Sequence, residues 1–132
     1  MTEPTTTPTR ERPPTDRPGF THDGLIYSGE GPIKVTITGN FYPDGRVCEV
    51  FVELEGASSG MHGMANCWAV AFSMALQSGV PLGTLLDKFD HQRFAPEGGT
   101  ANPKINFAKS VPDYVARWMR LQFCAEKEGV AA

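Results

Sequence analysis

Residues 81–118 read PLGTLLDKFDHQRFAPEGGTANPKINFAKSVPDYVARW and are the most informative stretch of the chain. Within it, residues 82–89 have the apolar spacing of a short helix. The segment that follows, 90–109, shows no periodicity, and we expect a long loop there. Loops of this length in compact domains are usually functional or disordered.

A further helix is predicted to begin at Ser110. Ser110 and Asp113 have the spacing of a capping box, in which side-chain oxygens accept hydrogen bonds from free backbone N–H groups at the helix start. Pro112 falls in the first turn, where its missing N–H costs nothing. We expect this helix to run to about Cys124.

Two segments nearer the N-terminus alternate with period two, which is typical of half-buried strands. These are residues 33–37 and 48–54, and the run 25–27 could be an earlier strand. The segment 42–45 reads Tyr-Pro-Asp-Gly, a turn signal between the two alternating segments. The pattern therefore predicts an antiparallel hairpin.

The segment 61–77 has helical periodicity and is apolar on almost every side. A helix of this kind must be covered over most of its surface. A hairpin and two short helices do not suffice for that, so we expect self-association or a partner at this helix. The candidate interface residues are Met61, Met64, Trp68 and Phe72.

The two ends of the chain differ in composition from its middle. Residues 1–19 are rich in Pro and Thr, and Met1 is their only large apolar residue, so we expect a disordered arm. A chain of 132 residues accommodates one domain. We predict a single α+β domain over 20–126, with an antiparallel hairpin sheet packed against two to three helices, and a flexible tail over 127–132.

Composition excludes several classes of function. The net charge of −3 offers no basic surplus for duplex nucleic acid. Cys48, Cys67 and Cys124 are far apart and lack metal-ligand spacing, so we expect no disulfide framework and no metal site. Cys48 and Cys67 are expected to be small core residues.

No apolar run is long enough for a membrane span or a signal peptide, which favours a cytoplasmic protein with reduced thiols.

Several short motifs resemble those of one known family. The motif Ser110-Val111-Pro112-Asp113 resembles the one that gives the TSCPD domain its name, with Val111 in place of the motif cysteine. This domain lies at the C-terminal end of vitamin B12 (adenosylcobalamin)-dependent ribonucleotide reductases. The resemblance extends over about residues 10–124. Three other groups of residues also resemble the family. The first is Arg10-x-Arg12 with Pro14, Arg17 and Thr21-His22, and the second is Asp44-Gly45-Arg46 with Glu49-x-Phe51. The third is Ser73-x-x-Leu76-Gln77-x-Gly79-Val80-Pro81-Leu82.

The resemblance implies a free-standing copy of this domain, with an accessory or regulatory role in deoxyribonucleotide synthesis. The catalytic barrel of the reductases is absent, so no residue is predicted to be catalytic and no cofactor is expected to bind. Adenosylcobalamin belongs to the related full-length reductase. The expected partners are the reductase catalytic chain, a second copy of this chain, or a nucleotide. A stand-alone nucleotide-binding or sequestering module, and a purely structural remnant, are the alternatives.

The start of the last helix is also a candidate phosphate site. Free N–H groups and the helix dipole favour anions there. The residues that could converge on a phosphate are Arg93, Lys104, Lys109, Ser110 and Arg117. Alternatively, Ser110 and Asp113 only cap the helix and the basic side chains are solvated. His91 could be a general base, but no partner is placed by spacing, so a loop-anchoring role is favoured.

Overall fold

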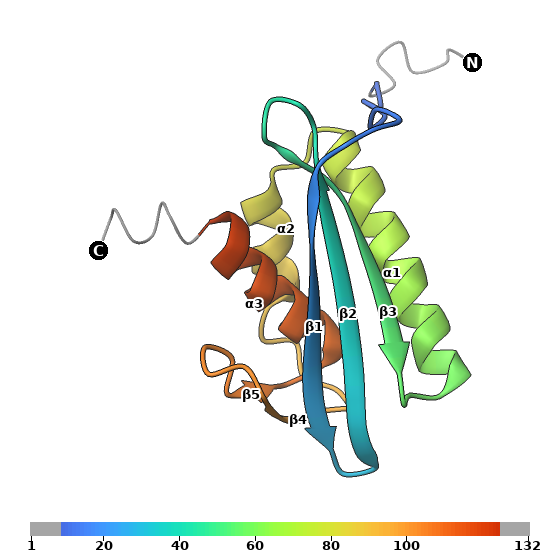
Figure 1. The fold of residues 1–132 in the computed structure, drawn as a ribbon, viewed down its shortest axis with the longest axis vertical. Helices are drawn as coiled ribbons and strands as arrows, with labels where there is room; N and C mark the ends of the chain where they lie inside the picture. Colours follow the sequence, from blue (N-terminus) through green and yellow to red (C-terminus); the bar gives the residue numbers. More distant parts are fainter. Residues whose placement is uncertain (1–8, 125–132) are drawn as a thin grey trace, which may run out of the picture.

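The computed structural model describes residues 9–124. Within that range, a five-stranded sheet and three helices form one α+β domain, as predicted (Figure 1). The predicted tail at 127–132 lies outside the described residues, as do residues 1–8. The elements are β1 Gly19–Ser28, β2 Gly31–Phe41, β3 Val47–Glu55, α1 Ser59–Gln77, α2 Leu82–Phe89, β4 Gly98–Thr100, β5 Phe107–Ala108 and α3 Val111–Phe123.

The sheet has the order β3-β2-β1-β4-β5, and each neighbouring pair is antiparallel. The predicted hairpin is confirmed as β2 and β3, joined at the predicted turn. Gly45 has φ 95° and donates its N–H to the Tyr42 carbonyl at 2.9 Å. A positive φ suits glycine because glycine has no Cβ. The apolar residues of β2, Ile33, Val35 and Ile37, are buried in the core, as period two requires.

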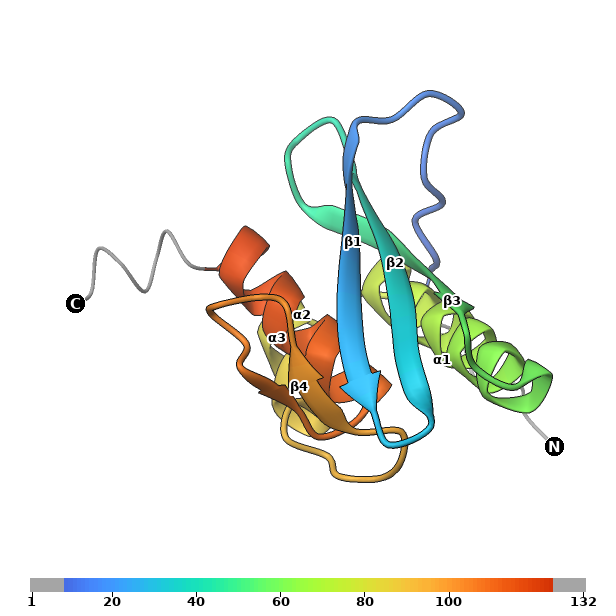
Figure 2. The same cartoon turned by 60° about the horizontal axis from the view of Figure 1, so that its bottom comes forward.

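Helix α1 lies along β3, the edge strand of the sheet (Figure 2). The Ser73 hydroxyl accepts from Val50 N at 2.9 Å and donates to Val50 O at 3.1 Å. Gln77 Nε2 donates to Cys48 O at 3.0 Å. These two polar side chains therefore satisfy backbone groups that an edge strand would otherwise leave unpaired. As a result, these two polar residues of α1 are turned toward the protein.

Helix α3 supplies much of the core on the other half of the sheet, and α2 packs beside it. Arg120 of α3 reaches two carboxylates near the end of α2, Asp87 and Asp90, at 2.9 Å each. The fully or almost fully buried apolar residues of α3 are Val111, Tyr114, Val115, Ala116, Trp118 and Met119. Both helices begin and end close to where the apolar spacing predicts.

The segment 90–109 is not a simple loop, so that prediction was wrong. It contains β4, which pairs with Ile26–Ser28 of β1, and β5, which pairs with β4. Strands of two or three residues are too short to produce a detectable period. β1 is also longer than the predicted run 25–27, because polar residues and Gly24 interrupt its apolar pattern.

Residues 9–18 differ from the disordered arm expected over 1–19. They have no helix or strand, but Glu11 N donates to Gln77 O at 2.8 Å and Arg10 Nε donates to Gln77 Oε1 at 2.6 Å. The Arg17 guanidinium contacts the buried carboxylate of Glu49. Disorder was expected because the segment has few apolar residues to bury. The structure instead holds it against the domain through hydrogen bonds and an ion pair.

Candidate functional site

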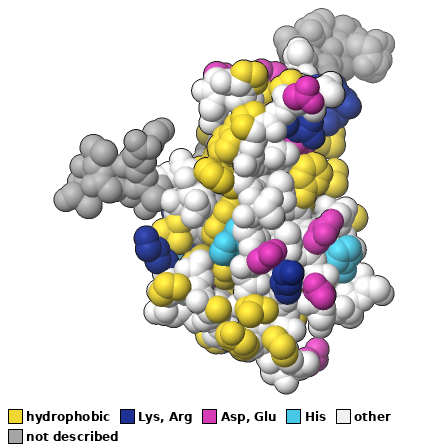
Figure 3. Space-filling model, viewed as in Figure 1, with side chains coloured by type: hydrophobic (Ala, Val, Ile, Leu, Met, Phe, Trp, Pro, Cys, Tyr) yellow, Lys and Arg dark blue, Asp and Glu magenta, His cyan; other side chains and the backbone are white. Residues whose placement is uncertain are grey.

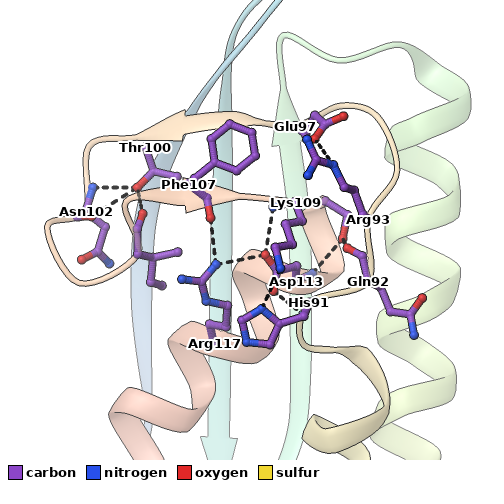
Figure 4. Close-up of polar contacts among 12 residues, drawn as sticks. His91, Gln92, Arg93, Glu97, Thr100, Asn102, Phe107, Lys109, Asp113 and Arg117 are labelled. Atoms are coloured by element: carbon purple, nitrogen blue, oxygen red, sulfur yellow. Dashed lines mark hydrogen bonds and ion pairs between the residues drawn. The ribbon is translucent and has the colours of Figure 1, made fainter.

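The buried carboxylate of Asp113 organises the start of α3 (Figure 4). Its side chain is fully buried and accepts from His91 N at 2.5 Å, Lys109 N at 2.9 Å and Arg117 Nη1 at 3.1 Å. Two of these donors are backbone N–H groups of the 90–109 segment. The predicted cap is therefore more than a local motif, because Asp113 also fixes the path of the chain that leads into the helix.

Ser110 is the predicted N-cap of α3, and the structure confirms it. The Ser110 hydroxyl accepts from Asp113 N at 3.0 Å and donates to Gln92 O at 2.7 Å. Ser110 is fully buried. Its hydroxyl proton and one of its lone pairs are therefore committed to partners inside the protein.

The other predicted phosphate ligands are distributed around this cap. Arg117 is engaged by Asp113 and donates to Phe107 O at 2.8 Å. Arg93 is paired with Glu97 at 2.8 Å. The Lys109 ammonium lies 3.3 Å from His91 Nδ1, and Lys104 is exposed in the turn after Asn102. The chain's own carboxylate thus occupies the position where a helix start attracts an anion. Phosphate binding stays a prediction.

His91 anchors its loop, as favoured above, although it does so through its backbone. Its φ of 67° is in the left-handed region, and its N–H is held by Asp113. A left-handed non-glycine residue is uncommon, and it persists where surrounding contacts determine it.

The outward surface of α1 carries no charged side chain and is mostly apolar, with Asn66 as an exposed polar residue. We call the exposed residues Met64, Cys67, Val70 and Met74 the α1 outer face. Met64 is 68% exposed, Val70 53% and Met74 45%. Residues 59–77 contain no Asp, Glu, Lys or Arg. The sheet surface turned away from the helices differs, because acidic and basic side chains are distributed over it (Figure 3). Asp23, Lys34 and Glu53 alternate with buried residues of their strands.

The four predicted interface residues do not share one environment. Met64 is exposed, whereas Phe72 is buried and belongs to the core. Met61 and Trp68 are partly buried, and the Trp68 ring packs 5.3 Å from Phe72 and 5.3 Å from Phe89. Cys48 is buried as expected, but the expectation that Cys67 is buried was wrong. Ser73 and Gln77 are bonded to β3, whereas Cys67 and Val70 are exposed.

A second polar cluster, formed by His22 and Tyr114, was not predicted from the sequence. His22 Nε2 and the Tyr114 hydroxyl are 2.9 Å apart. The His22 ring stacks on Trp118, with centroids 5.2 Å apart. The cluster borders a cavity of about 310 Å³ that is also lined by Gly24 and Asn102. His22 and Tyr114 are 92 positions apart, so no local signal could have joined them.

Burial sets the protonation of this pair. Burial lowers the pKa of His22 from its usual 6.5, and the nearby Asp23 carboxylate opposes that change. Burial raises the pKa of the Tyr114 hydroxyl, which a hydrogen bond from the Asn102 side chain opposes. At neutral pH the pair is therefore a neutral imidazole beside a protonated phenol.

The lowered pKa of His22 predicts a pH-dependent stability. Below the usual pKa of 6.5 the unfolded chain binds more protons at this position than the folded chain does. This contribution to stability is complete above pH 6.5 and is lost as the pH falls from there toward the lower folded-state pKa. Urea unfolding measured from about pH 7 to pH 5 should show this loss, and His22→Gln should reduce the slope. An unchanged slope in His22→Gln would contradict the assignment.

Residues 9–124 contain no group of three or more His, Cys, Asp and Glu side chains that could hold a metal ion. None of the helices in the same range has the length and apolar character needed to cross a membrane.

Comparison with known proteins gives one family match. Residues 6–123 match the TSCPD domain. The chain is 42% identical over 116 residues to a protein of Rhodopirellula baltica named vitamin B12-dependent ribonucleotide reductase. Proteins of the same name in Streptomyces avermitilis and Bradyrhizobium diazoefficiens are 39% and 34% identical.

These alignments cover most of this chain and little of the relatives. They include 88%, 88% and 86% of this chain but only 11%, 12% and 9% of the three reductases. The chain therefore spans about a tenth of the length of the curated relatives that it matches. No solved structure gives a significant match.

Proposed function

Because the chain belongs to the TSCPD domain family, we propose that it is an accessory domain of deoxyribonucleotide synthesis that binds the catalytic chain of a vitamin B12-dependent ribonucleotide reductase. Its role is binding and regulation, and reduction and adenosylcobalamin are assigned to the catalytic chain. In the Rhodopirellula baltica relative, the matching segment makes up 11% of one reductase polypeptide. The rest of that polypeptide is the natural candidate to cover the domain's exposed apolar surface.

The observation that carries this proposal is the orientation of α1. A helix on the surface of a monomer normally directs its polar side toward water. Here Ser73 and Gln77 are buried against β3, while the α1 outer face is exposed. Contiguous exposed apolar surface of this kind marks interaction sites, and methionine adapts to irregular partner surfaces.

The position of residues 10 and 11 supports the same binding surface on α1. Residues 10 and 11 are hydrogen-bonded to Gln77, the last residue of α1. A polypeptide that preceded this segment, as the resemblance implies for the reductases, would therefore reach the domain beside the C-terminal end of α1. The α1 outer face is then within reach of that preceding part.

The test is a direct binding measurement with a defined partner. A vitamin B12-dependent reductase from one of the matched organisms is purified without its own TSCPD segment, and binding is measured by calorimetry. We expect the wild-type chain to bind. Met64→Glu combined with Met74→Glu should weaken binding at least about tenfold, because both charges would be buried in the complex.

The matched control is Phe51→Glu, which also replaces an exposed apolar side chain by a carboxylate, but on the sheet surface turned away from the helices. Phe51 is 47% exposed on β3. Its substitution should alter the affinity less than about twofold. Failure of the wild type to bind would contradict the proposal, as would equal losses in both variants. A homodimer that is dissolved only by the α1 substitutions, without reductase binding, would assign this face to a second copy.

A further inference from the structure

We propose that the free part of the β1 edge is a binding site for an extended segment of a partner polypeptide, which adds to the sheet as a strand. β1 pairs with β2 along its whole length, from Gly19 to Ser28. On its other side, β4 covers only Ile26–Ser28 (Figure 1). Among residues 9–124, no strand pairs with residues 19–24 on that side, and Leu25 is contacted there by Ala101. This site is separate from the α1 outer face and does not rest on the proposed function.

The polar groups on this free edge can be identified from the pairing. Ala101 N donates to Leu25 O at 3.3 Å, so the backbone groups of Leu25 point toward the β4 side. Backbone N–H and C=O groups of a strand point to the same side at every second residue. Those of Asp23 and Thr21 therefore point to the free edge. No hydrogen bond from another element reaches them within the described residues.

Unpaired N–H and C=O groups at this spacing are complementary to the backbone of another extended chain. The contrast with the β3 edge is informative, because there Ser73 and Gln77 of α1 bond the backbone of Val50 and Cys48. The sheet therefore blocks one of its long edges with α1 side chains and leaves part of another accessible.

One cavity borders the free edge, and a larger groove begins at Phe20 near the other end of the edge. The cavity of about 310 Å³ is bordered by His22, Gly24 and Leu25 of β1, with Tyr114 and Asn102 among its other lining residues. A larger groove of about 770 Å³ lies between the β2–β3 turn, the start of α2 and the end of α3, and Phe20 is the β1 residue at its margin. Phe20 is 53% exposed, and its ring stacks on Phe123 at 6.5 Å.

The pairing also determines which side chains would enter these cavities. In an antiparallel pair, directly opposite residues point to the same face. His22 and Ile26 face the core, and so do Gly24 and Phe20 by alternation. A residue opposite Gly24 would lie beside the Tyr114 ring, which packs directly over Gly24, and beside Asn102. A residue opposite Phe20 lies against aromatic rings.

The structure therefore specifies the chemistry of the ligand. It is an extended peptide that continues in the direction of β4, antiparallel to β1. It carries a neutral hydrogen-bonding side chain for the His22–Tyr114–Asn102 cavity. Four residues later it carries an apolar side chain for the groove at Phe20, because alternate residues share a face.

The experiment uses synthetic nine-residue peptides of alternating Thr and Val, read out by amide NMR. The matching peptide has Asn opposite Gly24 and Leu opposite Phe20, and the control peptide exchanges these two residues. We expect the matching peptide to bind more tightly than about 1 mM and the control at least about tenfold more weakly. Binding should slow amide exchange at Thr21 and Asp23.

Two variants connect binding to the edge. Asp23→Pro removes the edge N–H and should abolish binding, whereas Asp23→Ala retains the N–H and should bind normally. Proline is tolerated at strand edges. If Asp23→Pro does not fold, Ala101→Trp provides the same test, because Ala101 lines the cavity and a larger side chain fills it.

Several outcomes would overturn this inference. They are the absence of binding by the matching peptide, binding that survives the blocking variant, and slow exchange of the Thr21 and Asp23 amides in the free protein. A concentration-dependent dimer that Asp23→Pro dissolves would assign the edge to a second copy, and the peptide site would be wrong.

Discussion

Asp113→Ala is expected to destabilise the protein by about 3–5 kcal/mol, the typical cost of removing one partner of a buried charge pair. The carboxylate is fully buried and accepts from two backbone N–H groups and from Arg117. Its removal leaves the N–H groups of His91 and Lys109 without an acceptor and a largely buried guanidinium without a counter-charge. A helix cap alone would account for only about 0.5–2 kcal/mol.

Asp87→Ala is the control for this prediction. Asp87 pairs with Arg120, but its side chain is 73% exposed. Exposed ion pairs contribute about 0–1 kcal/mol, so the loss should be small. Urea unfolding at neutral pH gives both free energies of unfolding. A loss in Asp113→Ala that is no larger than in Asp87→Ala would show that the buried network does not stabilise the fold.

Gly98→Ala is expected to cost about 3 kcal/mol, at the upper end of the overpacking range. A Cβ on Gly98 would overlap the carbonyl oxygen of Tyr27 and would lie 2.7 Å from its carbonyl carbon. Both atoms belong to the backbone of β1, so no side-chain rotation relieves the overlap. β4 must therefore move away from β1. Thermal unfolding measures the loss, and hydrogen exchange should show weaker protection of β4.

Gly63→Ala is the matched control, because a Cβ on Gly63 of α1 meets nothing within 4 Å. Alanine is the better helix former, so this variant should be more stable by about 0.5–1 kcal/mol. Equal effects of the two glycine substitutions would contradict the close approach of β4 to β1.

Local patterns in the sequence were sufficient for the elements that depend on neighbouring residues. Alternation over 33–37 and 48–54, with the turn at 42–45, predicted the hairpin of β2 and β3. Helical spacing predicted α1, and the Ser110–Asp113 spacing predicted the cap of α3. Each of these signals acts over a few residues, so it can be read along the chain.

The sequence was insufficient where distant polar residues meet. The pairing of Arg17 with Glu49 holds residues 9–18 against the domain, although their composition predicted disorder. The contact between His22 and Tyr114 depends on the crossing of β1 and α3. The strands β4 and β5 form because Gly98 allows close approach to β1.

The sequence by itself therefore determined the α+β class, the central hairpin, the helices and the family, because each rests on local periodicity or on a motif. Only the tertiary structure decided which surfaces are free. The apolar content of α1 was evident, but its exposed side depends on Ser73 and Gln77 bonding β3. Likewise, the free edge of β1 exists because β4 ends at Thr100. The solvent exposure of a side chain or a strand edge depends on how the whole chain packs, and local patterns in the sequence do not specify that packing.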